Sequence, residues 1–298
     1  MDIPALRGPA MTPTSTGLGM FTSALAPSFA PTLRSIQTAL AVQGGDWRSV
    51  GVSLRSDRVA KTLNPQNGLY SLLIRHPKAT VPQMIGSVAE VLTVNNDASR
   101  VLTLLTAPET RVVTLTITET AYGFDRDSNA LTQDHPVIND LKTPRSPRSA
   151  IGLIVESLRQ RKASNVPPTT ILSCDNLPEN GRFLRRAVLA YAAQVDADLH
   201  DWIAGSVAFP SSMVDRITPA QTDQTLQDVL ALCGYQDSAA IETEPFTQWV
   251  IEDNFPTGRP AWEAGGVLFV EDVAPFEEMK LRMLTSTFRV QNKIKLKD

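Results

Sequence analysis

The sequence predicts an α/β fold with a mostly parallel sheet flanked by helices. From residue 46 onward, short apolar runs with strand character alternate with segments of helical periodicity. The run 111–117 is continuous and rich in β-branched residues, as in a parallel strand buried on both faces. A chain of 298 residues that is 42% hydrophobic can build a sizeable core.

Each element follows from a local pattern. Residues 1–45 are rich in Pro, Ser, Thr, Ala and Gly and are expected to be irregular, apart from a short helix at 32–42. Strands 70–74 and 90–94 are interpreted as a hairpin or an edge addition, and 125–147 as a polar loop. The other expected strands are 47–54, 111–117, 169–174, 207–209, 213–215, 247–251 and 266–270, and the expected helices are 56–63, 149–162, 180–195 and 198–204.

Composition excludes several classes of partner. The formal net charge of -3 offers no electrostatic basis for binding nucleic acid or an anionic membrane. No apolar run approaches the roughly 18 residues of a membrane span, and the N-terminus lacks a signal-peptide pattern. The two cysteines favour a reducing, cytoplasmic setting over a disulfide framework. The three histidines, at positions 76, 135 and 200, show no metal-site spacing, so no metal is expected.

Candidate chemistry lies where the strands end, because ligands of open parallel sheets bind at the carboxyl ends of the strands. Asn176 follows one such strand and offers a neutral amide that can donate to a substrate oxygen. Asp215 follows another, and Lys280 on a C-terminal helix is a candidate general base. Each of these residues also has a purely structural explanation. Asn176 can belong to an Asp-Asn turn or helix cap, Asp215 can form an ion pair with Arg216, and Lys280 can be a solvated lysine on a helix surface.

A phosphate-binding turn is expected after the first strand of a dinucleotide fold. The candidate is the segment Gly17-Leu18-Gly19-Met20-Phe21, in which only two of the usual three glycines are present. The polar residues 12–16 give no sign of a strand before it.

Several motifs in order resemble the mannitol dehydrogenase family of polyol-specific long-chain dehydrogenases, over about residues 46–284. The motifs are Gly51-Val52-Ser53-Leu54-Arg55-Ser56, Thr116-Ile117-Thr118-Glu119, Ser173-Cys174-Asp175-Asn176-Leu177-Pro178-Glu179-Asn180-Gly181, Phe209-Pro210-Ser211-Ser212-Met213-Val214-Asp215-Arg216 and Met279-Lys280-Leu281-Arg282-Met283-Leu284. The resemblance implies a Rossmann-like domain that binds NAD or NADP without a metal. It also implies interconversion of a polyol or aldonate alcohol with the ketose or keto-uronate, as in mannitol and fructose or mannonate and fructuronate.

The resemblance also implies roles for individual residues. Lys280 matches the family's general base, Asn176 an asparagine that polarises the reacting oxygen, and Asp215 a substrate-binding aspartate. Cofactor binding is assigned to Gly17, Gly19, Phe21, Arg55 and Glu119. Because Arg55 stands where an acidic ribose-binding residue is expected, both NAD and NADP remain possible.

The sequence departs from the family at both ends. Thr285 and Phe288 occupy the positions of an asparagine and a histidine, and the helical C-terminal domain is expected to be missing. We therefore divide the chain into an irregular start (1–45), a Rossmann-like domain (46–284) and a non-family tail (285–298). Without a covering domain, Lys280 is expected to face water and stay protonated.

Three interpretations follow: an NAD(P)-dependent oxidoreductase acting on a small polyol or keto-sugar, an inactive truncated or frameshifted remnant that at most binds nucleotide, or a domain completed by a separate chain. For the chain as written we expect no measurable polyol dehydrogenase activity and at most weak cofactor affinity. Altered reading frames at residues 21–46 and 284–298 would explain why the resemblance is interrupted there.

Overall fold

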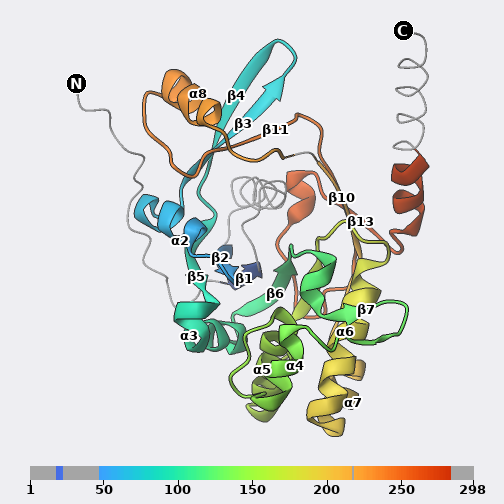
Figure 1. The fold of residues 1–298 in the computed structure, drawn as a ribbon. Coiled ribbons are helices and arrows are strands. Elements are labelled where there is room, and N and C mark those ends of the chain that lie inside the picture. The colour runs from blue at the N-terminus through green and yellow to red at the C-terminus, as the bar shows by residue number, and fades with distance from the viewer. Residues whose placement is uncertain (1–17, 23–46, 217, 283–298) are drawn as a thin grey trace.

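A five-stranded parallel sheet forms the centre of the molecule (Figure 1). The computed structural model describes residues 47–216 and 218–282, together with the backbone of 18–22. The strands are β1 (Leu18–Thr22), β2 (Trp47–Ser53), β5 (Val88–Thr93), β6 (Thr110–Leu115) and β9 (Thr170–Ser173). Their order is β5-β2-β1-β6-β9, and every neighbouring pair is parallel. Counted along the chain this is the order 3-2-1-4-5 of a Rossmann fold, which confirms the predicted fold class.

Helices cover one face of this sheet. They are α3 (Val94–Thr106), α5 (Ala150–Ala163), α6 (Asn180–Val195) and α7 (Ala197–Ser206). The predicted inward residues of α5 are buried, among them Ile151 and Leu158 at 0% exposure. Helix α5 begins where the Ser149 hydroxyl accepts a hydrogen bond from the Gly152 amide, as an N-cap does.

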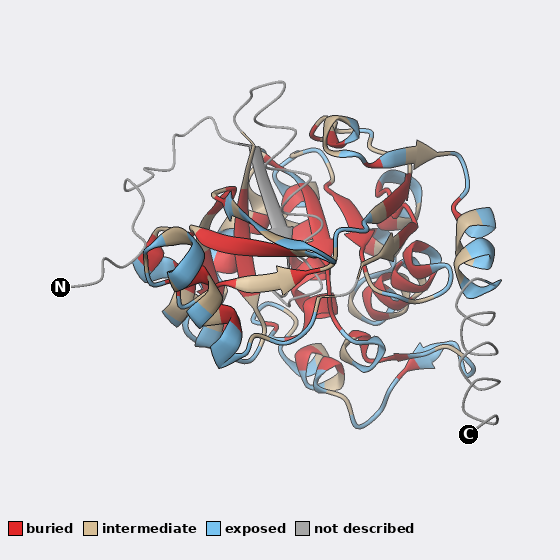
Figure 2. Cartoon of the chain, turned by 90° about the horizontal axis from the view of Figure 1, so that it is seen from above, coloured by how far each residue is buried: buried red, intermediate tan, exposed pale blue. Residues whose placement is uncertain are grey.

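A second layer covers the opposite face. It contains α2 (Arg58–Leu63) and a three-stranded sheet of β10 (Ser212–Asp215), β12 (Gln248–Glu252) and β13 (Leu268–Val270). Val113 and Leu115 of β6 belong to the apolar cluster on the helical face, while Val112 belongs to the cluster that holds Trp249 and Trp262. Strand β6 is thus buried on both faces, as its continuous apolar sequence predicts. In Figure 2 the described strands at the centre of the molecule are mostly coloured as buried.

A hairpin projects from this body. Strand β3 (Tyr70–His76) pairs antiparallel with β4 (Ala79–Ile85) and parallel with β11 (Ile241–Thr243). The alternative that 70–74 and 90–94 form a hairpin is wrong, because residues 90–93 lie in β5, at the edge of the central sheet. The hairpin partner is Ala79–Ile85, which was not apparent in the sequence because the stretch contains Pro82 and the polar residues Thr80 and Gln83.

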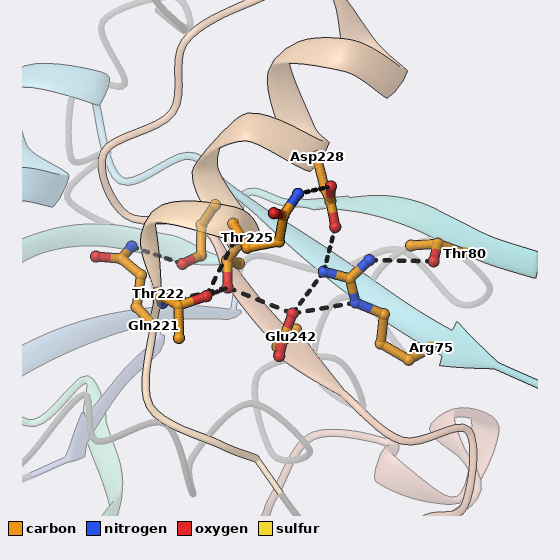
Figure 3. A network of polar contacts seen from close by, with 9 residues as sticks. Arg75, Thr80, Gln221, Thr222, Thr225, Asp228 and Glu242 are labelled. Atoms are coloured by element: carbon orange, nitrogen blue, oxygen red, sulfur yellow. Dashed lines mark hydrogen bonds and ion pairs between the residues drawn. The ribbon is translucent and has the colours of Figure 1, made fainter.

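A polar network ties this hairpin to α8 (Asp223–Cys233) and β11 (Figure 3). The Arg75 guanidinium lies 2.6 Å from carboxylate oxygens of both Asp228 and Glu242, and it donates to the Thr80 hydroxyl. Thr225, at the start of α8, donates to the same Glu242 carboxylate. The network holds three segments that are far apart in the sequence.

Other expectations need correction. The predicted loop 125–147 contains α4 (Pro136–Lys142) and part of the short pair β7 (Phe124–Asp125) and β8 (Ala130–Leu131), whose strands are too short to show a period in sequence. Residues 207–209 form no strand, although the Ala208 carbonyl accepts from the Ile171 amide. The expected helix 32–42 lies outside the described residues. The other described elements are the 3-10 turns η2 (Asn64–Gln66), η3 (Glu119–Tyr122) and η4 (Trp262–Gly265), and a helix that begins at residue 274. No helix in the described part of the chain is long and apolar enough to span a membrane.

Candidate active site

Lys280 is held by acceptors from two different sheets. It lies on the helix that begins at residue 274, and its Nζ donates to the Asn176 Oδ1 at 2.8 Å and to the Val214 carbonyl at 2.7 Å. Asn176 belongs to the loop after β9, and Val214 lies in β10. The structure therefore brings together the lysine and the asparagine that the sequence proposed as catalytic partners.

The ammonium group is poorly solvated. The Lys280 side chain is 11% exposed, and this burial lowers the pKa of Lys280. Asp215, whose Oδ1 lies 4.0 Å from Nζ, and Glu277 act in the opposite direction on that pKa. The expectation that Lys280 faces water is wrong, because the β9 loop and β10 already cover the side chain.

Asp215 reaches this site from an unexpected direction. The strand-end rule suggested that Asn176 and Asp215 follow parallel strands of one sheet. Asp215 is instead the last residue of β10, which belongs to the second sheet and runs antiparallel to β12. The two sheets are joined here by side chains, including the Ser212 hydroxyl, which donates to the Ser173 carbonyl at 2.6 Å.

A buried polar cluster that the sequence did not reveal lies next to Asn176. The Tyr122 hydroxyl donates to the Asp175 carboxylate at 2.6 Å and lies 2.8 Å from the Ser173 hydroxyl. Burial raises the pKa of Asp175 to about 7, although the Tyr122 hydrogen bond opposes the shift. Asp175 was visible in the motif around Asn176, whereas no sequence signal pointed to Tyr122, 53 residues away.

Two of the residues assigned to cofactor binding, Arg55 and Glu119, lie at the carboxyl edge of the central sheet. Arg55 follows β2 and is exposed, and its carbonyl accepts from the Asn95 side chain. Glu119 begins η3 just after β6, with its Oε1 4.0 Å from the Arg126 Nε. Their polar contacts are with these neighbours and not with the Lys280 cluster.

The glycine-containing segment is not the turn that the sequence suggested. Gly19 and Phe21 lie within β1, which pairs with β2 on one side and β6 on the other. The ladder with β6 shifts register between Gly19 and Met20. Strand pairing on both sides therefore overrides the local turn preference of glycine, and the carboxyl end of β1 is Thr22. Gly17 lies outside the described residues.

Within 47–216 and 218–282, no group of three or more His, Cys, Asp or Glu side chains is arranged to hold a metal ion.

This fold, with a lysine at the edge of its sheet, defines a dehydrogenase-like α/β domain. Residues 30–264 match the family described as the mannitol dehydrogenase Rossmann domain. The chain belongs to this family, which confirms the resemblance found in its motifs.

Known relatives are oxidoreductases. The chain is 44% identical over 251 residues to the oxidoreductase YeiQ and 44% identical over 247 residues to D-mannonate oxidoreductase, both of Escherichia coli K12. These alignments cover 83% and 81% of this chain. The Pseudomonas fluorescens mannitol 2-dehydrogenase, solved as a ternary complex with NAD and D-mannitol, superimposes with a TM-score of 0.86 at 38% identity, over 93% of this chain and 57% of that one. The chain spans about half the length of the curated relatives it matches, 51% in both cases.

Proposed function

We propose that this chain forms the cofactor-binding and lysine-bearing part of an NAD(P)-dependent oxidoreductase. The substrates would be a polyol or aldonate and the corresponding ketose or keto-uronate. The observation that carries the proposal is the position of Lys280, whose side chain is only 11% exposed and whose Nζ donates to Asn176 and Val214. Family membership and the oxidoreductase relatives support the same reaction class.

The hydrogen-bond pattern suits Lys280 to act as a base. A neutral amine has two N–H groups and one lone pair. If the two N–H groups donate to Asn176 and Val214, the lone pair points away from both and can accept the proton of a substrate hydroxyl. Because burial lowers the pKa of Lys280, more of this neutral form is present near neutral pH.

The neighbouring groups suit substrate binding. The Asn176 amide keeps its Nδ2 donors available for the reacting oxygen, since Lys280 uses only Oδ1. Asp215, with a side chain that is 32% exposed, offers a carboxylate to further hydroxyl groups of the substrate. These three residues are therefore the catalytic and substrate-binding groups that we propose.

The cofactor would lie across the carboxyl edge of the central sheet. Strand order reverses on either side of β1, and dinucleotides bind at such a switch point. The exposed Arg55 after β2 and Glu119 after β6 are charged groups at this edge, and they suit a ribose phosphate and a ribose hydroxyl, respectively. A nicotinamide cofactor held at this edge would supply the hydride acceptor that oxidation of the substrate alcohol requires. We leave both NAD and NADP within the proposal, because Arg55 replaces the acidic residue typical of NAD sites.

A direct assay tests the function. The purified chain is mixed with NAD(H) or NADP(H) and with mannitol, fructose, mannonate or fructuronate, while nicotinamide fluorescence and absorbance are followed. Turnover that is lost in Lys280→Ala and kept in Lys78→Ala supports the proposal, since Lys78 is exposed in the β3–β4 turn. Absence of both nucleotide binding and turnover would contradict it.

Binding without turnover would favour the alternative of a domain that binds nucleotide and does not itself catalyse. In that case the partner we propose is a separate chain carrying the other half of the relatives' sequence, and adding it should restore turnover.

We also propose a cytoplasmic location, supported by the free thiols of Cys174 and Cys233, and a domain division at residues 46 and 284.

A further inference from the structure

The Lys280 site depends on the spacing between two sheets. Its two acceptors, Asn176 Oδ1 and the Val214 carbonyl, come from the β9 loop and from β10. Along the chain these acceptors are separated by helices α6 and α7, which span residues 180–206. Contacts other than the chain itself must therefore fix the distance between them.

Asn180 makes such a contact. Its side chain is 0% exposed, and its Nδ2 donates to the Asp175 carbonyl at 2.8 Å and to the Ser212 carbonyl at 2.7 Å. Its Oδ1 accepts from the Ser212 amide at 2.9 Å. One amide thus joins the residue before Asn176 to the first residue of β10. It satisfies both backbone groups of Ser212, as a neighbouring strand would.

Only a side-chain amide of this length can make all three bonds. A carboxylate would bring negative charge against two carbonyl oxygens, and an apolar side chain would leave three buried partners unsatisfied. Gly181 allows the start of α6 to approach the backbone of Phe209 and Pro210 closely. A Cβ at position 181 would lie 2.5 Å from the Pro210 carbonyl oxygen and 2.6 Å from that of Phe209. Asn180 thus joins the start of α6 to β10, and Gly181 lets the same turn pack against the two residues 209 and 210 that lead into β10.

We propose that Asn180 is a positioning residue that sets the distance between Asn176 and Val214 and thereby holds Lys280 in its working geometry. The proposal rests on the proposed function of Lys280. It adds a residue that touches neither substrate nor cofactor. Its effect is expected at Lys280, where loosening of the two acceptors admits water to Nζ.

The test measures Lys280 directly in the whole chain. The rate of acetylation of each lysine is followed against pH by mass spectrometry, with exposed Lys78 as the internal reference. The midpoint is the pH at which the acetylation rate of a lysine reaches half its maximum. In the unaltered protein the midpoint for Lys280 should lie below that for Lys78. Asn180→Leu should move the Lys280 midpoint upward by about 0.5 pH unit or more, a roughly threefold loss of neutral amine near neutral pH. Asp215 on β10 and Glu277 on the lysine's own helix face Nζ in all variants, and the substitution changes no charge.

Gln66 supplies a matched control. It is another buried amide with three hydrogen bonds, which join Leu69, Asp237 and Ser238 in the region of the β3–β4 hairpin. Gln66→Leu should lower stability by a similar amount and leave the Lys280 midpoint unchanged. A folded Asn180→Leu protein with an unchanged midpoint would overturn the proposal.

Two further measurements remain decisive if Asn180→Leu does not fold. Gly181→Ala should shift the Lys280 midpoint in the same direction, because its Cβ pushes α6 away from the carbonyls of Phe209 and Pro210, which lead directly into β10. In the unaltered protein, the Ser212 amide should exchange with deuterium far more slowly than the Lys78 amide. Equally rapid exchange would show that Asn180 does not hold Ser212 of β10 in place, and it would refute the proposal. If the Lys280 midpoint in the unaltered protein equals that of Lys78, the function proposed for Lys280 fails. The exchange rate of the Ser212 amide still tests separately whether Asn180 holds β10 in place.

Discussion

Asp175 should make the stability of this protein depend on pH. Its carboxyl is partly buried beside Tyr122, and burial raises its pKa from 3.8 to about 7 in the folded state. A carboxyl with a raised pKa favours folding when it is protonated. Its stabilising contribution is complete below about pH 3.8, falls as the pH rises, and is lost by about pH 7.

The size of the effect follows from the two pKa values. At pH 5 the unfolded chain has already released most of this proton, and at pH 8 both states have released it. The free energy of unfolding should therefore be about 2.5 kcal/mol lower at pH 8 than at pH 5 because of this group. Asp175→Asn keeps an oxygen that can accept from the Tyr122 hydroxyl and removes the titration.

The assay is urea unfolding at pH 5, 6, 7 and 8, followed by tryptophan fluorescence. Asp175→Asn should lose most of the decline with pH and become the more stable protein at pH 8. Asp198→Asn is the control, since the Asp198 side chain is 90% exposed. Parallel stability curves for Asp175→Asn and the unaltered protein would refute the reasoning.

Three further substitutions and one thiol reagent test the fold. Arg161 is 1% exposed and donates to the carbonyls of Leu105, Ala107, Thr110 and Pro167, so Arg161→Leu should lower the free energy of unfolding by about 3–5 kcal/mol, measured by urea unfolding. Gly68 has a φ of 75°, and a Cβ there would overlap the Val88 carbonyl oxygen, so Gly68→Ala should cost about 3 kcal/mol or more in the same assay. Gly205→Ala, in the open helical environment of α7, should instead be neutral or stabilising, and equal losses for the two would contradict this account. Burial raises the pKa of the Cys174 thiol, so an aromatic disulfide reagent should modify the partly exposed Cys233 first and Cys174 only on unfolding. Prompt reaction of both thiols would show that the strand end is open.

Local patterns predicted the helices and buried strands well. Helix 180–195 is confirmed at both ends, and the expected helix 149–162 is confirmed as α5, whose N-cap in the structure is Ser149. Strand 111–117 is confirmed as β6, two positions shorter at its C-terminal end. These elements are encoded within a few residues, by the period of the apolar positions and by capping groups.

The sequence by itself determined the α/β class, the family and the identity of Lys280, Asn176 and Asp215 as neighbours, because the motifs keep those residues in order. Only the tertiary structure decided which strands pair. It placed Gly19 within β1, moved β10 into a second sheet, and put Tyr122 against Asp175. It also showed that Lys280 is shielded from water by Asn176 and Val214. Pairing and burial depend on contacts between segments that are tens of residues apart, and the periodicity of a single segment carries no record of its partner.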